Sequence, residues 1–226
     1  MSNMTDIASI KESFKNKDLF DQALTHRSWV NEHKGQRNSN ERLEFLGDAI
    51  LEYVVSKEIY EKFPDKEEGY LTALRANIVN TVSLALLAKK INLGELIYLS
   101  KGEEEGGGRA NPSLLADTLE AIIGAIFTDR GVDAAQEFIE KNLINNIEER
   151  IKEPLKDHKS RLQEMVQGKG LPAPKYQVIS EVGPDHSKGF IVEVLVGGVP
   201  WGRGEGKSKS TAQQEAARQA LSKKVK

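Results

Sequence analysis

The chain has 226 residues, of which 38% are hydrophobic and 29% are charged, a composition typical of a folded globular protein. It contains no cysteine, which excludes disulfide bridges and thiolate metal sites. No run of about 18 apolar residues occurs, so we predict no membrane span. The polar N-terminus, residues 1–15, lacks the apolar core of a signal peptide. These features predict a cytoplasmic protein.

The net charge of −2 conceals an acidic front and a basic tail. Residues 157–226 hold 12 Lys and Arg against 7 Asp and Glu, whereas residues 1–156 hold 20 against 27. Such a division suits cation binding in the first part and polyanion binding in the second, although ordinary surface charge would also account for it. Because only four histidines are present, we expect any metal site to be built from carboxylates, which favours Mg²⁺ or Mn²⁺ over zinc.

Apolar residues recur three and four positions apart over residues 5–152, which predicts a mostly helical region. Breaks in this pattern fall at residues 35–39, 64–69 and 101–112. We predict the third break to be a flexible surface loop, because glycines flank three consecutive glutamates there. Asn111-Pro112 predicts the start of a new helix, with Asn as the N-cap and Pro in the first helical position.

The pattern changes near Glu153-Pro154. A short helix is predicted over about 159–167, followed by three strands in which apolar residues alternate with others. Gly197-Gly198 predicts a two-residue hairpin turn between the second and third strands. A last helix is predicted over about 208–224, so the tail is expected to be helix, three antiparallel strands, helix.

Three carboxylates share one face of a predicted helix: Glu41, Glu44 and Asp48 are spaced three and four apart. Like charges at this spacing repel one another by a few tenths of a kcal/mol per pair on an exposed helix. A bound divalent cation would turn that repulsion into attraction.

Two more carboxylates, Asp117 and Glu120, interrupt an almost wholly apolar helix. Buried carboxylates must be paired, hydrogen-bonded or metal-bound. Besides a metal site, Asp117 could be a helix-start charge, and Glu120 could form a salt bridge with Arg42 or Arg75. Glu52, near the phase of the first acidic face, we interpret as a solvated surface charge.

These segments closely resemble the sequence motifs of the ribonuclease III family. The string NERLEFLGDAIL at residues 40–51 is similar to the family's signature, and residues 23–28 and 117–121 are similar to its other blocks, in the same order. The resemblance covers nearly the whole chain. It implies a multidomain fold of α plus α/β type, with an all-α catalytic domain at 1–152. A double-stranded-RNA-binding domain of α-β-β-β-α order would follow at 157–226.

The resemblance also implies the site. Glu44, Asp117 and Glu120 would ligate a catalytic Mg²⁺, for which Mn²⁺ would substitute, and no small-molecule cofactor is expected. Asp48 and Glu120 would be the residues most needed for cleavage. Glu41 and Glu68 match acidic family positions that contact a second metal or the RNA. We interpret His26 as structural and not as a general base, because metal-bound water needs no histidine.

The implied activity is endonucleolytic hydrolysis of double-stranded RNA, leaving 5′-phosphate and 3′-hydroxyl ends. Expected substrates are ribosomal RNA precursors, with some messenger and transfer RNAs. A duplex needs two cuts, so we expect a homodimer, in which Phe45 projects into a socket on the partner.

Two alternatives are a catalytically dead RNA-binding protein on this fold and a different carboxylate–metal hydrolase with the same tail. The catalytically dead protein is disfavoured because all six acidic residues of the family pattern are present: Glu41, Glu44, Asp48, Glu68, Asp117 and Glu120. The different hydrolase is disfavoured by Phe45 and Gly47, which metal binding does not require.

In the tail, the resemblance implies three contacts with duplex RNA. Ser160, Gln163 and Glu164 of the first helix would face a minor groove. His186, in the loop 183–186, would enter the next minor groove. Lys207 and Lys209, before and at the start of the last helix, would bind phosphates. The chain departs from the family pattern at Ser210 and Gln213, where charged residues are usual, so one phosphate contact is expected to be lost.

Overall fold

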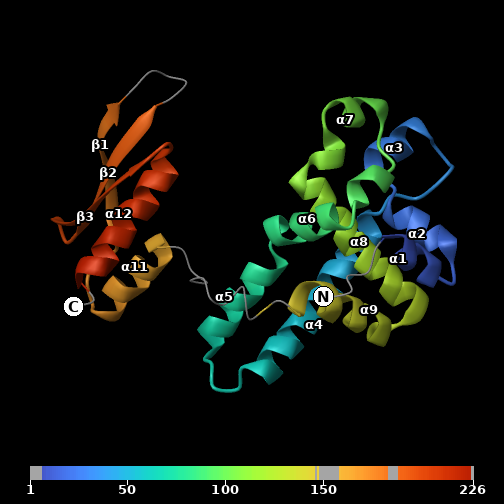
Figure 1. Cartoon of the computed structure of the whole chain (residues 1–226), viewed down its shortest axis with the longest axis horizontal. Helices are drawn as coiled ribbons and strands as arrows, with labels where there is room; N and C mark the ends of the chain where they lie inside the picture. Colours follow the sequence, from blue (N-terminus) through green and yellow to red (C-terminus); the bar gives the residue numbers. More distant parts are fainter. Residues whose placement is uncertain (1–6, 146, 148–157, 183–187, 225–226) are drawn as a thin grey trace. The chain divides into compact units, whose positions relative to one another are not determined.

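The computed structural model describes residues 7–145, 147, 158–182 and 188–224. The chain divides into two compact units, Met1–Glu153 and Pro154–Lys226, which Figure 1 shows as a helical part and a part that contains a sheet. Each unit is described separately below.

In the described part of the first unit, the regular elements are helices, and one isolated β-bridge joins Thr25 and Tyr98. Its α-helices are α1 (Ile7–Ser13), α2 (Lys17–Ala23), α3 (Arg27–Glu32), α4 (Glu41–Lys62), α5 (Glu68–Val79), α6 (Thr81–Lys90), α7 (Lys101–Glu105), α8 (Pro112–Arg130) and α9 (Val132–Ile139). Two 3₁₀ turns, η1 (Leu93–Leu96) and η2 (Gly108–Ala110), precede α8, and a π-helical turn, η3 (Glu140–Ile144), follows α9. As predicted, Asn111 caps α8 by accepting a hydrogen bond from the Ser113 amide, and Pro112 occupies the first turn.

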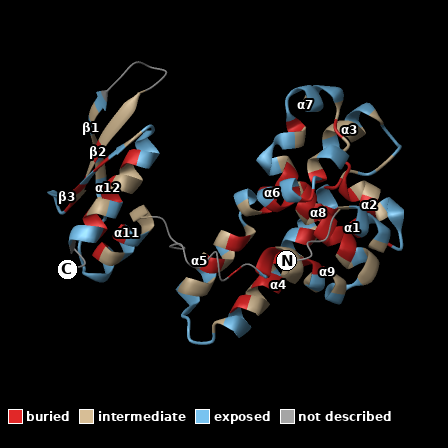
Figure 2. Ribbon diagram, in the orientation of Figure 1, coloured by how far each residue is buried: buried red, intermediate tan, exposed pale blue. Residues whose placement is uncertain are grey.

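Helix α8 forms the centre of this unit, and Figure 2 shows it mostly in the colour of buried residues. Leu115, Leu119, Ile122, Ile123 and Ile126 have no exposed surface. Helix α8 packs most extensively against α4. The two helices approach backbone to backbone, since a Cβ on Gly47 would collide with the carbonyl oxygen of Glu120. A Cβ on Gly124 would likewise collide with the carbonyl oxygen of Leu43.

The prediction of a flexible loop over residues 101–112 was wrong. Ser100 caps α7 by accepting a hydrogen bond from the Glu103 amide. Arg109 then donates to the carbonyl oxygens of Gly94, Glu95 and Ile97 over distances of 2.9–3.2 Å. These bonds satisfy backbone groups that a free loop would leave to water, so the segment is folded despite its glycines.

One stretch, Glu68–Lys90, is long and apolar enough by composition to cross a membrane. Asn80 interrupts it, because its backbone is extended (ψ 157°) between the end of α5 and the start of α6. The two helices have 12 and 10 residues, and each is shorter than the roughly 20 residues that a span requires. The stretch is therefore a helical pair of the first unit.

The second unit has the predicted order: α11 (His158–Gly168), β1 (Lys175–Val182), β2 (Gly189–Val196), β3 (Val199–Gly206) and α12 (Lys209–Lys224). The strands form an antiparallel sheet in the order β1-β2-β3. The predicted hairpin turn is confirmed: Gly197 and Gly198 have φ of 59° and 81°, as a type I′ turn requires.

Helix α12 lies directly on β3. Gly202, Gly204 and Gly206 alternate along the strand, and a Cβ on any of them would collide with the α12 backbone. The facing residues of α12 are small and buried, with Ala212 and Ala216 fully enclosed. This close approach completes a core that includes Leu162 of α11 and the valines of β2.

Candidate metal centre and RNA-binding surface

The close crossing of α4 and α8 brings carboxylates from both helices to one place. Glu44 lies on α4, and Asp117 and Glu120 lie on α8. One carboxylate oxygen from each of these three residues lies within 4.8 Å of the others. Asp117 is in the second turn of α8, beyond the first turn where a helix-start charge would be favoured. The structure therefore brings together the three predicted metal ligands.

The cluster is electrostatically unfavourable in the absence of a cation. Burial, followed by repulsion from Asp48, Asp117 and Glu44, raises the pKa of Glu120 to about 8. Burial and the charge of Asp117 raise the pKa of Glu44 above its ordinary value. Burial also raises the pKa of Asp117, against a smaller lowering effect from His26. Oxygen ligands this close together, with charges that no described cation pairs directly, fit a hard divalent ion.

Asp48 lies one turn beyond Glu44 on α4 and is exposed. Its charge is the largest electrostatic contribution to the raised pKa of Glu120. The fourth predicted catalytic acid thus borders the cluster from the solvent side.

Glu41 occupies the rim of a pocket of about 330 Å³ that also includes Glu44 and Asp117. Its carboxylate accepts hydrogen bonds from Ser39 (2.9 Å) and Arg27 (3.0 Å). These bonds, that of Ser39 first, lower the pKa of Glu41. Glu41 is therefore ionised and already hydrogen-bonded, in contrast to the half-buried acids of the cluster.

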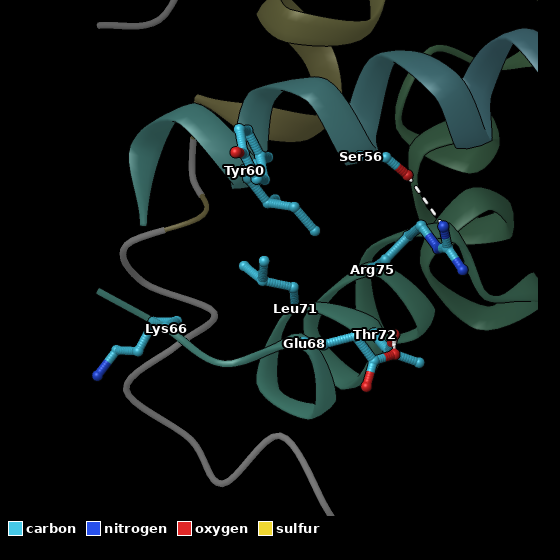
Figure 3. Close-up of a pocket in the computed structure, with 8 residues that line it drawn as sticks. Ser56, Tyr60, Lys66, Glu68, Leu71, Thr72 and Arg75 are labelled. Atoms are coloured by element: carbon cyan, nitrogen blue, oxygen red, sulfur yellow. Dashed lines mark hydrogen bonds between the residues drawn. The ribbon is translucent and has the colours of Figure 1, made fainter. Parts of the chain in front are cut away.

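Glu68 is not brought to the cluster within this chain. It lies at the start of α5 and accepts a hydrogen bond from the Thr72 hydroxyl at 2.8 Å. It lines a separate pocket of about 350 Å³ between α4 and α5, with Tyr60, Leu71 and Arg75, which Figure 3 shows.

The interpretation of Glu52 as a solvated surface charge was wrong. Its carboxylate lies 2.7 Å from Nε of Arg75, with 38% of the side chain exposed, and its charge contributes to the raised pKa of Glu120. Arg75 is therefore occupied by Glu52 and does not form the alternative salt bridge with Glu120. Helical phase indicated Glu52, but a single helix pattern could not identify a partner on another helix.

His26 has the structural role that was expected of it. It is the N-cap of α3, and its Nδ1 accepts a hydrogen bond from the Ser28 amide at 3.2 Å. The same nitrogen lies 2.8 Å from the Ser28 hydroxyl. The ring nevertheless lines the pocket that contains Asp117.

In the second unit, Gln163 and Glu164 are exposed on α11, and Ser160 is half-buried on the same helix. Leu162 and Val166 face the core. Lys207 and Lys209 are exposed before and at the start of α12. His186 and its loop lie outside the described residues.

Two side chains near the start of α12, Lys209 and Gln213, contact other elements of the second unit. Nζ of Lys209 lies 3.3 Å from a carboxylate oxygen of Glu181, which also pairs with Lys188 at 3.1 Å. Gln213, at the position where the family usually has a charge, accepts a hydrogen bond from Nζ of Lys159 at 2.7 Å. Gln213 thus connects α12 to α11.

A helical unit with a half-buried carboxylate cluster and a second unit of α-β-β-β-α order make up the described part of the chain, which is the arrangement expected of a nuclease with a separate RNA-binding domain. Comparison with family models gives a "Ribonuclease-III-like" match at residues 16–147 and a "Double-stranded RNA binding motif" match at residues 158–224. The chain belongs to the ribonuclease III family, whose members are double-strand-specific endoribonucleases.

Curated relatives agree over most of the chain. It is 48% identical to "Ribonuclease 3" of Geobacillus kaustophilus over 92% of this chain and 85% of the relative. It is 45% identical to "Ribonuclease 3" of Caldanaerobacter subterraneus over 95% of this chain and 94% of the relative. A solved nuclease domain of ribonuclease III from Campylobacter jejuni is 46% identical, with a TM-score of 0.54, and the match covers 61% of this chain and 98% of that one. The C-terminal unit is accordingly a double-stranded-RNA-binding domain, and family membership implies dependence on a divalent metal.

Proposed function

We propose that this chain hydrolyses duplex RNA with Mg²⁺ held by Glu44, Asp117 and Glu120, Mn²⁺ being an alternative. The observation that carries the proposal is the convergence of these three carboxylates within 4.8 Å. When bound, the ion supplies an activated water and charge stabilisation at the scissile phosphate. The products have 5′-phosphate and 3′-hydroxyl ends.

The acidic residues at the site have different proposed roles. Glu44, Asp117 and Glu120 are carried by two helices in backbone contact, so we expect the metal site to be preorganised before RNA binds. Asp48, which is exposed one turn beyond Glu44, would accept a hydrogen bond from the attacking water. Glu41, which accepts a hydrogen bond from Arg27, would contact a second metal or the RNA.

We propose that the active species is a homodimer. Phe45 is 80% exposed on α4 between the acidic residues, where burial by a partner would remove a large apolar surface from water. Tyr53, Val82 and Leu86 are also more than half exposed. The pocket between α4 and α5 (Figure 3), with Tyr60 and Leu71 in its walls, is of a size to receive an aromatic ring. The relative from Campylobacter jejuni is described with a region involved in dimer formation.

Such an arrangement would give Glu68 a role that it lacks within one chain. Glu68 lines the same pocket, so a partner's Phe45 seated there would place Glu68 beside the acidic face of the partner's α4. Glu68 would then reach the second metal or the RNA at the partner's site.

The RNA-binding domain would contact two minor grooves and the intervening phosphates. Ser160, Gln163 and Glu164 would face one groove, His186 would enter the next, and Lys207 and Lys209 would bind phosphates between them. The natural substrates that we propose are ribosomal RNA precursors, with some messenger and transfer RNAs, in the cytoplasm.

Cleavage of a long RNA duplex with and without Mg²⁺, compared between the parent and Glu120→Gln, tests the proposal. The substitution keeps the size of the side chain but removes the charge. Cleavage should fall at least about a hundredfold, equivalent to roughly 2.7 kcal/mol of transition-state stabilisation, while duplex binding persists. Glu105→Gln, at an exposed residue of α7, is the matched control. If the Glu120→Gln protein folds, binds RNA and cuts at the parent rate, Glu120 is not a ligand of the catalytic metal.

A further inference from the structure

Arg75 of α5 is fixed to one turn of α4. Its Nε lies 2.7 Å from the Glu52 carboxylate. Its Nη1 donates to the Ser56 hydroxyl at 3.0 Å, and Figure 3 shows this second contact as the dashed line between Arg75 and Ser56. The Ser56 hydroxyl in turn donates to the backbone carbonyl of Glu52 at 2.6 Å. Three contacts therefore hold the guanidinium, the hydroxyl and Glu52 in one arrangement.

Glu52 borders the carboxylate cluster. It follows Asp48 by one turn and Glu44 by two turns on the same face of α4. Its charge reaches Glu120 on α8. The cluster thus has a fifth carboxylate at its edge, and this one has a cationic partner, unlike the three acids that converge.

We propose that Arg75 sets the charge of the metal centre: by engaging Glu52, it prevents that carboxylate from adding a full negative charge to the cluster or competing as a ligand. The inference rests on the proposed function, since it takes the cluster to hold a divalent cation. Arg75 is a positioning residue, because it acts through Glu52 and does not touch the reacting atoms.

The proposal makes two substitutions act in opposite directions. Without Arg75, Glu52 becomes an unpaired anion near the ion, so Mg²⁺ should bind more tightly. Without Glu52, Arg75 becomes an unpaired cation, so Mg²⁺ should bind more weakly. We expect the Mg²⁺ dissociation constant to change by about fivefold at low ionic strength. A unit charge still acts on a divalent ion through water when the two are closer than a Debye length.

A simple tie between α4 and α5 would behave differently. If Arg75 only joined the helices, Arg75→Met and Glu52→Gln would lower the melting temperature in the same direction. Neither would change the affinity for metal. Metal affinity therefore separates the two roles, whereas stability alone does not.

The experiment is calorimetric titration of the full-length protein with Mg²⁺ in the absence of RNA. Arg75→Met should lower the Mg²⁺ dissociation constant, Glu52→Gln should raise it, and the double variant should return it close to the parent value. Arg75→Lys, which keeps the charge, should also bind Mg²⁺ like the parent. Arg37→Met removes an ion pair of similar exposure, 3.4 Å from Asp21, and should leave Mg²⁺ affinity unchanged.

Each outcome decides the matter. Opposite shifts that cancel in the double variant support the proposal. Parent-like affinity in both folded single variants overturns it and leaves the proposed metal centre intact. A parent protein that binds no Mg²⁺ overturns both. If Arg75→Met does not fold, the other two variants still test the proposal. Glu52→Gln must weaken Mg²⁺ binding, and Arg75→Lys must leave Mg²⁺ binding unchanged.

Discussion

Gly47 of α4 faces the backbone carbonyl of Glu120 on α8 so closely that no Cβ fits between them. Gly124 meets the carbonyl of Leu43 in the same way. Because the two helix backbones are this close, Glu44, about one turn before Gly47 on α4, lies near Asp117 and Glu120 on α8. The glycine in the signature segment thus has a structural reason: it fixes the distance between the two halves of the metal centre.

We predict that Gly47→Ala destabilises the protein by about 3 kcal/mol or more, because the added methyl must displace packed backbone and not a flexible side chain. Denaturant unfolding measures the change. Gly69→Ala is the matched control, since nothing lies within 4 Å of its Cβ position on α5; it should be neutral or slightly stabilising. Parent-like stability of Gly47→Ala would mean that the helices are not in backbone contact.

The contrast between Glu120 and Glu52 shows what the sequence could predict. Helical spacing and family resemblance indicated the acids at residues 41–48 and those at residues 117–120. The structure brings Glu44, Asp117 and Glu120 together. The partner of Glu52 was not predictable, because periodicity describes one helix at a time and Arg75 lies on another. The folding of residues 101–112 depends likewise on Arg109 reaching carbonyls 12–15 positions earlier. In the tail, by contrast, alternation and Gly197-Gly198 were sufficient, since those signals are local.

The raised pKa of Glu120 predicts a pH dependence of stability in metal-free protein. The folded-state pKa, about 8, exceeds the ordinary value of 4.5, so folding favours the protonated acid. This contribution is fully present below about pH 4.5 and is lost as pH rises through about 8. The metal-free parent should therefore lose melting temperature relative to Glu120→Gln across this interval, as a thermal scan at each pH would show.

Mg²⁺ should reverse this trend, because binding requires the ionised carboxylate and so strengthens with pH. The stabilisation by saturating Mg²⁺ should accordingly be larger at pH 8 than at pH 6. Identical pH profiles for the metal-free parent and Glu120→Gln would contradict the burial of an unpaired carboxyl group.

Phe45→Ala should weaken the dimer without weakening the fold. The ring is 80% exposed in the single chain, so its removal costs no intramolecular packing. A buried aromatic anchor at an interface commonly contributes about 2 kcal/mol or more, which corresponds to a rise of about thirtyfold or more in the dimer dissociation constant. Sedimentation over a concentration series measures it. Val199→Ala, at a residue 58% exposed in the second unit, is the control, and a parent that sediments only as monomer at micromolar concentration would exclude the proposed dimer.

The RNA-binding domain should distinguish RNA from DNA through Gln163 and bind phosphates through Lys209. Gln163 is exposed on α11, where an amide can bond to 2′-hydroxyl groups that DNA lacks. Lys209 begins α12 and offers charge to any phosphate backbone. In competition binding, excess DNA duplex should barely displace RNA from the parent and should displace it more readily from Gln163→Ala. Lys209→Ala should instead weaken both duplexes alike and reduce the slope of log affinity against log salt by about 1. If DNA competes equally with RNA for the parent protein, binding is electrostatic alone and the groove contact of Gln163 is misassigned.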